Sequence, residues 1–240
     1  ANWWALGAGT RAWFARRVVL VGAESTGTTT LGQDLTAHYG VPEVPEFGRT
    51  WSEIRPGGFE APWHSAEFDF IAREQSRLED DAARVTPIPL VIADTDAFAT
   101  SLWHERYIGE TSPGVVALAA TRVPDLYLLT GDEIPFVPDG LRDGEHIRHA
   151  MQQRFREELG SQSAPWVELR GSCAERLAAA IAIIDPLLAS PRPLSDPLPE
   201  AGVSAPSIEE PSARPDPPSA GSNSDAGPRC AAVARRETQG

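Results

Sequence analysis

One short segment near the N-terminus constrains the fold of this chain most strongly. The run Val18–Val21 is apolar and mostly β-branched, which is typical of a buried parallel strand. A loop from Gly22 to Gly27 follows it, and Thr29–Tyr39 then carries apolar residues at helical spacing. A strand that leads through a glycine-bounded loop into a helix is the framework of a phosphate-binding loop.

The loop matches the pattern G-x-x-x-x-G-K-[ST] at Gly22, Gly27 and Thr29. Glycines permit the tight turn, and the backbone N–H groups at the start of the helix point toward bound phosphate. The Thr29 hydroxyl is placed to ligate Mg²⁺ between the terminal phosphates of ATP. The alternative is a turn rich in glycine and threonine that binds nothing. We expect the nucleotide to be bound by Gly22, Ala23, Glu24, Ser25, Thr26, Gly27, Thr28, Thr29 and Thr30.

Thr28 stands where this pattern has lysine, and the chain contains no lysine, because all 21 basic residues are arginine. The lysine of such loops reaches the terminal phosphates and neutralises charge during transfer. Threonine donates a hydrogen bond but supplies no charge. The loop therefore either borrows an arginine, with Arg49 and Arg142 as candidates, or transfers phosphate slowly or not at all.

Strands and helices alternate along the rest of the chain. The sequence predicts further strands at 41–44, 89–93, 126–129 and 166–169, and helices at 66–85, 97–108, 115–121, 145–159 and 174–188. This alternation predicts an α/β fold of the P-loop NTPase type, a parallel sheet flanked by helices. The C-terminal region, which holds half of the 22 prolines and no aromatic residue, is predicted to be a disordered tail.

The composition argues against two classes of partner. A net charge of −13 argues against nucleic acid, whose phosphates are bound mainly by lysine and arginine. A membrane span needs roughly 20 consecutive apolar residues, and the sequence contains no such run, so no membrane is expected. Cys173 and Cys230 form neither a metal motif nor a disulfide framework, which favours a reducing cytoplasm.

Asp94 is the first candidate for chemistry outside the loop. It follows the apolar run at 89–93, at the carboxyl end of a predicted strand, where open α/β sheets place their ligands. A carboxylate there can hold Mg²⁺ or orient an acceptor hydroxyl. The alternative is a helix cap, because Asp94-Thr95-Asp96 precedes a predicted helix, and one aspartate can cap while the other works.

Further polar and aromatic residues lie in the segments between the predicted strands. Glu46 and Arg49 are placed to reach an acceptor molecule, although a surface ion pair explains them equally well. Arg142 lies among turn residues at 135–144, which suits either a mobile lid over the phosphates or a plain surface loop. The indoles of Trp51, Trp63 and Trp103 could stack on a ring, although packing is their commoner role.

Four motifs occur together in the chain: Val18–Leu31 (VVLVGAESTGTTTL), Pro45–Arg49 (PEFGR), Ile92–Ala99 (IADTDAFA) and Val137–Arg142 (VPDGLR). Their combination, order and separations resemble the kinase domain of NadR-type NAD-biosynthesis proteins, which are P-loop ribosylnicotinamide kinases of an AAA-like family. The resemblance covers roughly residues 17–188. The departure is Thr28, where most members of the family have lysine.

The resemblance implies ATP-dependent phosphorylation of the 5′-hydroxyl of nicotinamide riboside, with ATP and Mg²⁺ as cofactors. Glu46, Arg49 and Asp94 then bind the acceptor, Thr29 and Asp94 hold the metal, and Arg142 is the lid arginine. Catalysis falls to Asp94, Glu46 and Arg142.

The resemblance also implies a domain organisation. Residues 1–16 are a remnant or linker behind an adenylyltransferase domain that this chain lacks, 17–188 are the P-loop kinase domain, and 189–240 are the Pro/Ser/Ala-rich tail. Two other functions stay open. One is a P-loop kinase for another small nucleoside, since such cores do not specify the acceptor. The other is an ATP-binding regulatory module that hydrolyses little.

Overall fold

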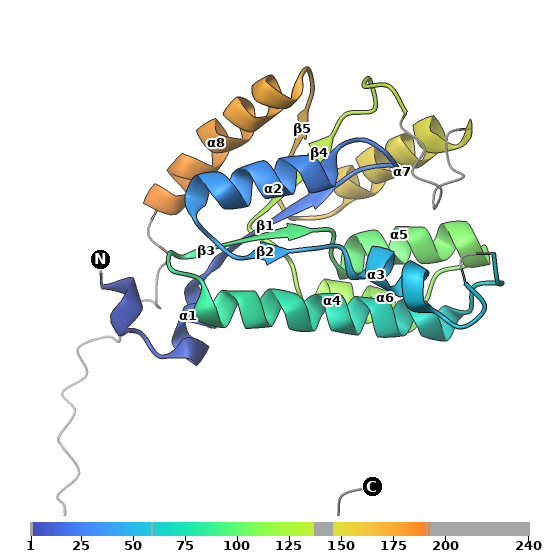
Figure 1. Ribbon diagram of the computed structural model, residues 1–240, viewed down its shortest axis with the longest axis horizontal. Helices are drawn as coiled ribbons and strands as arrows, with labels where there is room; N and C mark the ends of the chain where they lie inside the picture. The colour runs from blue at the N-terminus through green and yellow to red at the C-terminus, as the bar shows by residue number, and fades with distance from the viewer. Residues whose placement is uncertain (1, 59, 137–145, 191, 193–240) are drawn as a thin grey trace, which may run out of the picture. The chain divides into compact units, whose positions relative to one another are not determined.

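A parallel sheet forms the centre of the computed structural model, with its strands in the order β2–β3–β1–β4–β5 (Figure 1). The structure describes residues 2–58, 60–136, 146–190 and 192. They all belong to one unit, Ala1–Leu194, and the second unit, Ser195–Gly240, lies outside the described residues. The strands are β1 (Arg16–Val21), β2 (Glu43–Val44), β3 (Leu90–Asp94), β4 (Leu126–Thr130) and β5 (Trp166–Leu169).

Helices connect and flank these strands. They are the 3₁₀ turn η1 (Trp3–Ala5) and the α-helices α1 (Ala8–Phe14), α2 (Thr28–Tyr39), α3 (Phe47–Ile54), α4 (Ser65–Val85), α5 (Ala97–Ile108), α6 (Pro113–Ala120), α7 (Arg148–Ser161) and α8 (Cys173–Ala189). Within the described residues, no helix is both long and apolar enough to cross a membrane.

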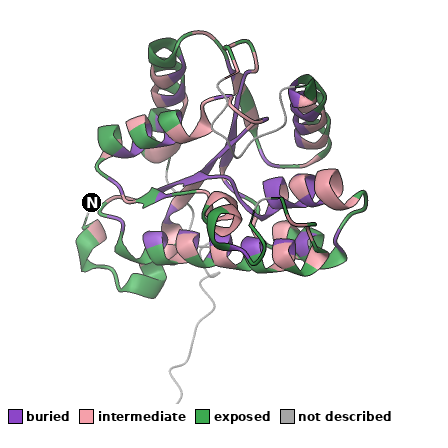
Figure 2. Cartoon of the chain, turned by 45° about the vertical axis from the view of Figure 1, so that its right-hand side comes forward, coloured by how far each residue is buried: buried purple, intermediate pink, exposed green. Residues whose placement is uncertain are grey.

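The central strand β1 shows why its sequence is apolar throughout. Side chains alternate between the two faces of a strand. Val18 and Leu20 therefore join a buried cluster with residues of α2 and α8, whereas Val19 and Val21 join a cluster with residues of α4, α5 and α7. Figure 2 shows this buried layer running through the sheet between helices that are exposed on their outer sides. Both faces of the sheet are covered, as a parallel sheet requires.

The sequence predicted the sheet and most helices to within a few residues. β2 is shorter than predicted and lies at an edge of the sheet, where Pro42 is tolerated because its missing N–H is not needed. Two helices were missed. These are α1, whose sequence shows no clear periodicity, and α3, which contains most of the PEFGR motif. The predicted tail beyond residue 192 lies outside the described residues.

The residues before β1 pack onto the domain. Trp3 Nε1 donates a hydrogen bond to the carbonyl of Thr86 at 2.8 Å, and Trp3 and Ala12 pack against the buried cluster that includes Ala82 and Ala83 of α4. The side chains of Trp4 and Trp13 are exposed. The segment predicted to be a linker is thus partly integrated into the fold of this unit.

Candidate functional site

The phosphate loop joins the end of β1 to the start of α2, and its backbone has little room to vary. A Cβ atom at Gly22 would lie 2.5 Å from the hydroxyl oxygens of both Thr26 and Thr130. Gly27 has φ +88°, and Ser25 has φ 55° although it is not glycine. Such angles are the left-handed conformations that a tight anion-binding loop needs. The two glycines of the sequence pattern are therefore required for different reasons, close approach at Gly22 and backbone angle at Gly27.

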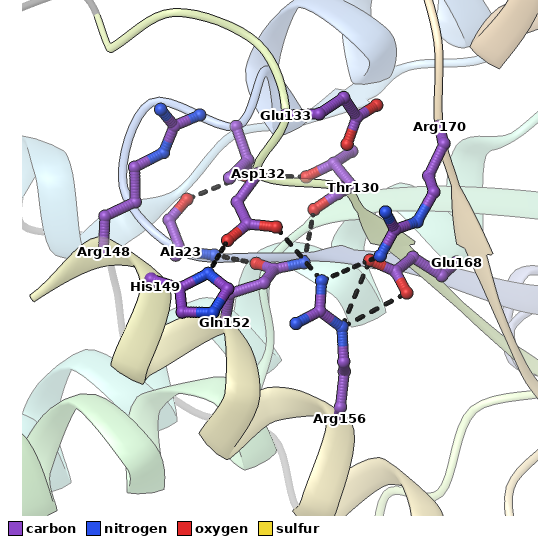
Figure 3. Close-up of polar contacts among 12 residues, drawn as sticks. Ala23, Thr130, Asp132, Glu133, Arg148, His149, Gln152, Arg156, Glu168 and Arg170 are labelled. Carbon is purple, nitrogen blue, oxygen red and sulfur yellow. Dashed lines mark hydrogen bonds and ion pairs between the residues drawn. The ribbon is translucent and has the colours of Figure 1, made fainter.

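A buried glutamine on α7 holds the loop from behind, as Figure 3 shows. The backbone N–H of Ala23 donates to Gln152 Oε1 at 3.0 Å, and Gln152 Nε2 donates to the carbonyl of Thr130 at 2.8 Å. The Gln152 side chain is completely buried. One side chain thus fixes the loop relative to the end of β4. Sequence reasoning missed this residue, because a glutamine in a polar helix gives no signal of burial.

Two buried arginines also bind loop carbonyls. Arg148, the first residue of α7, donates from Nη2 to the Ser25 carbonyl at 3.1 Å. Arg176 on α8 donates from Nη1 to the Thr26 carbonyl at 2.7 Å and pairs with Glu133 at 2.7 Å. Neither arginine was among the sequence candidates. The sequence signal was indirect, since a chain without lysine must draw any positive charge from its arginines.

Thr29 and Asp94 meet at the mouth of the loop. Thr29 Oγ1 donates a hydrogen bond to Asp94 Oδ2 at 2.6 Å, which joins the start of α2 to the end of β3. The capping role belongs to Asp96, whose Oδ1 accepts from the Ala99 N–H at 2.9 Å. Asp94 is therefore not needed as the side-chain cap of α5, and its functional role stays a prediction.

A cavity lies beside the loop, with a volume of about 980 Å³ that includes space open to solvent. It brings together residues far apart in the sequence, including the predicted acceptor-side residues Glu46, Arg49 and Asp94. Loop residues line it together with a group of aromatic side chains, the aromatic wall. The loop contributes Gly22, Ala23, Glu24, Ser25 and Thr28, and the aromatic wall consists of Trp63, Phe68, Trp103, Tyr107 and Phe155.

The other sequence candidates differ in whether they line this cavity. Arg49 lines it and also lies 4.0 Å from Glu53, so the ion-pair interpretation and the acceptor interpretation both describe part of its surroundings. Trp51 donates from Nε1 to Glu67 at 3.0 Å and belongs to the framework of α3 and α4. Arg142 lies outside the described residues.

Within the aromatic wall, Trp63 is held in place by Arg55. The Arg55 side chain is 1% exposed, and all five of its N–H groups make hydrogen bonds. Nε and Nη2 grip the Glu67 carboxylate, and the remaining bonds go to backbone carbonyls of the segment 58–62. The guanidinium carbon lies 3.9 Å from the centre of the Trp63 ring. The hydrogen bond from Arg55 is the main reason that the pKa of Glu67 is lowered to about 2.

A family model described as an AAA domain matches residues 17–176. The chain belongs to this AAA domain family. The match begins at the second residue of β1 and runs through the loop, the cavity residues and the first turn of α8. It therefore includes each described residue that we place at the candidate site.

Curated relatives of this AAA domain agree with the resemblance noted from the four motifs. The chain is 30% identical over 159 residues to the trifunctional NAD biosynthesis/regulator protein NadR of Salmonella typhimurium, covering 65% of this chain and 38% of the relative. It is 31% identical over 129 residues to the NadR protein of Escherichia coli, covering 54% of this chain and 31% of the relative. The chain thus spans about a third of the length of the curated relatives it matches.

Solved structures share the fold of this AAA domain. A NadR protein crystallised with NR has a TM-score of 0.66 at 21% identity, covering 78% of this chain and 56% of that one. A NadR protein in complex with NAD and AMP-PNP has a TM-score of 0.63 at 22% identity, covering 81% of this chain and 55% of that one. At this level of identity the likeness establishes the P-loop fold predicted from the sequence.

Proposed function

We propose that this domain is an ATP-dependent kinase that phosphorylates the 5′-hydroxyl of nicotinamide riboside. The observation that carries the proposal is that the phosphate loop, Asp94 and the acceptor-side residues Glu46 and Arg49 all line one cavity. A phosphoryl donor held by the loop and an acceptor held by the other residues would share that space. The NadR relatives, one of them solved with NR and one with AMP-PNP, support the same donor and acceptor.

The loop would bind ATP through its backbone amides from Gly22 to Thr30. These amides lie at the N-terminus of α2, where the helix dipole adds to the attraction for phosphate. Because phosphoryl transfer needs little covalent chemistry from the protein, positioning and charge stabilisation would supply most of the catalysis.

Thr29 and Asp94 would hold Mg²⁺. Their oxygens already converge to 2.6 Å, and a hydroxyl and a carboxylate are the hard ligands that this ion prefers. When bound, the ion neutralises charge on the terminal phosphates. Two protein ligands suffice, since Mg²⁺ in such sites is completed by phosphate oxygens and water.

Glu46 and Asp94 would act on the acceptor. A carboxylate that accepts a hydrogen bond from the 5′-hydroxyl orients its oxygen toward the terminal phosphate and can take up its proton. Arg49 would bind ribose hydroxyls from the same side of the cavity. Arg142, which the resemblance places in a lid, keeps that role as a proposal.

The aromatic wall suits the nicotinamide ring in particular. Nicotinamide riboside carries a positive charge on its ring, and aromatic faces attract cations by up to about 2 kcal/mol when water is excluded. Trp63, Trp103 and Tyr107 line the cavity together with three carboxylates, those of Glu24, Glu46 and Asp94. A cationic ring should therefore bind better here than a neutral base, which favours nicotinamide riboside over the other nucleosides.

One observation keeps a second function in view. Thr28 occupies the lysine position, so the domain could bind ATP without transferring its phosphate and act as a regulatory module. From the resemblance of the four motifs we also propose that residues 1–16 connect to an adenylyltransferase domain, and the NadR relatives are longer than this chain.

The decisive experiment measures ADP release from Mg·ATP with nicotinamide riboside and with a panel of neutral nucleosides. We expect turnover that is highest with nicotinamide riboside. Preferred turnover of another nucleoside would reassign the acceptor, and tight ATP binding without turnover would favour the regulatory module.

A further inference from the structure

The residues that line the cavity carry more negative than positive charge, and the loop adds no cation. Among the described residues that line the cavity, three are carboxylates and one, Arg49, is a cation. ATP brings several more negative charges, and Thr28 supplies none to balance them. Bound Mg²⁺ offsets only part of this charge. A further positive group is needed close to the loop, and arginine is the only side chain in the sequence that can supply a permanent one.

Three described arginines lie near enough to be considered, and their surroundings differ. Arg176 is 3% exposed, but its guanidinium pairs with Glu133 at 2.7 Å, so its charge is already compensated. The Arg49 side chain is 39% exposed and lies beside Glu53. Arg148 is 9% exposed, and its hydrogen bonds go to the neutral carbonyls of Ser25 and Ile134 at 3.1 and 2.8 Å.

Arg148 also has N–H groups that these two hydrogen bonds do not use. A guanidinium has five N–H groups, and these two carbonyls accept from only two of them. Its Nε is buried and has no hydrogen-bond partner among the described residues. A buried donor without a partner costs roughly 1–3 kcal/mol.

The position of Arg148 is fixed from three sides. Gln152, one turn further along α7, is bonded to the loop at Ala23. Arg156, a turn beyond it, pairs with Asp132 at 3.0 Å and with Glu168 at 2.7 Å, which ties α7 to the ends of β4 and β5 (Figure 3). The helix that carries Arg148 is therefore clamped to both the loop and the sheet, so the guanidinium is held in advance of nucleotide binding.

We infer that Arg148 takes over the charge-neutralising role of the absent loop lysine, which makes it a catalytic residue of the kinase proposed above. In the transfer step the acceptor oxygen forms a bond to the γ-phosphorus, and the bond from that phosphorus to the β–γ bridging oxygen breaks. The hydroxyl proton passes to a carboxylate, and the electron pair of the broken bond stays on ADP. Arg148 stabilises the negative charge that grows on the phosphate oxygens during this step.

The test compares Arg148→Gln, which removes the charge, with Arg148→Lys, which keeps it. We expect Arg148→Gln to lower kcat by about 10²- to 10³-fold, the usual effect of losing one preorganised charge-stabilising donor. Arg148→Lys should stay at least tenfold more active than Arg148→Gln. Adding Thr28→Lys to Arg148→Gln should restore kcat at least tenfold, because it returns a cation to the loop. Arg154→Gln, a more exposed position on the same helix, should stay within about twofold of the parent chain.

The outcomes separate this inference from the proposed function. Equal losses in Arg148→Gln and Arg148→Lys, with no rescue by Thr28→Lys, would show that Arg148 only supports the loop. If the parent chain phosphorylates no nucleoside, the proposed function fails, and the inference is judged by binding. Arg148→Gln should then weaken Mg·ATP binding at least tenfold more than AMP binding, and an equal loss for both nucleotides would overturn it.

Discussion

The hydroxyl of Thr29 donates to a carboxylate oxygen of Asp94 over 2.6 Å, which bonds the first turn of α2 to the carboxyl end of β3. This contact places the two expected metal ligands side by side although they are distant in the sequence. It also explains why Asp94 points toward the loop while its neighbour Asp96 caps α5.

Asp94→Asn should lower kcat for phosphoryl transfer by at least about 10²-fold, because the amide is a poor metal ligand and cannot take up a proton. Nucleotide affinity measured without metal should change little, because the loop amides remain. Steady-state kinetics and isothermal titration, with and without Mg²⁺, measure the two effects. Loss of metal-free binding equal to the loss of kcat would count against the assigned role.

Gln152→Leu should destabilise the domain, because it leaves the Ala23 N–H and the Thr130 carbonyl buried without their partner. Each such group costs about 1–3 kcal/mol of unfolding free energy. Urea unfolding measures this change. The matched control is Gln153→Leu, an exposed neighbour on the same helix bonded to Glu157, which should stay within about 0.5 kcal/mol of the parent chain. Equal effects at the two positions would refute the role of Gln152.

Gly22→Ala should distort the loop, since the added carbon would lie 2.5 Å from two threonine hydroxyls and 3.2 Å from the Thr130 carbonyl oxygen. We expect a loss of about 1–3 kcal/mol in stability, as for other overpacked sites, together with weaker ATP binding. Gly160→Ala, on α7 with no heavy atom within 4 Å of the new carbon, should instead raise stability by about 0.5–1 kcal/mol. Thermal unfolding of both variants with and without Mg·ATP provides the comparison.

Glu79 should make stability depend on pH. Burial, reinforced by repulsion from Asp96, raises its pKa to about 7, against attraction from Arg122 and Arg17. Because the folded state holds this proton more tightly than the unfolded state, the group favours folding below about pH 4.5, and that contribution is lost as the pH rises toward 7. The loss is about 3 kcal/mol at 1.4 kcal/mol per pH unit.

Glu79→Gln mimics the protonated acid, so its stability relative to the parent chain should increase between pH 4.5 and 7 and then level off. Chemical unfolding across this range measures the difference, which also cancels the titration of the other carboxylates. Glu74→Gln, an exposed change on the same helix, should show no such trend. A pH-independent difference for Glu79→Gln would mean that its pKa is not raised in the folded protein.

The loop, the sheet and the aspartate pair could be predicted because each leaves a local pattern. The apolar composition of Val18–Val21 indicates a buried strand. The spacing of Gly22, Gly27 and Thr29 indicates the phosphate loop. The place of Asp94 directly after a predicted strand indicates that it lies at the carboxyl edge of the sheet. The supports of the loop leave no such pattern. Gln152, Arg148 and Arg176 come from helices distant in the sequence, and only the three-dimensional packing brings them to the loop carbonyls and amides.

The lining of the cavity could be predicted from the sequence only in part. Glu46 and Arg49 were found by their place after a strand, whereas Phe68, Tyr107 and Phe155 look like ordinary core residues of amphipathic helices. Nothing in the sequence distinguishes an aromatic ring that faces a cavity from one that fills a core. The helix α3 was missed because eight residues next to a proline give too short a window for helical periodicity.

All five N–H groups of the Arg55 guanidinium are hydrogen-bonded, and this affects how the proposed site would select a nucleoside. The five hydrogen bonds of Arg55 and its contact with the Trp63 ring hold this aromatic residue of the cavity in position before a ligand arrives. A nucleoside of the kind proposed above would therefore meet Trp63 already in place, and association would cost less conformational freedom. We therefore expect this side of the cavity to select its ligand by shape and not to rearrange around larger bases.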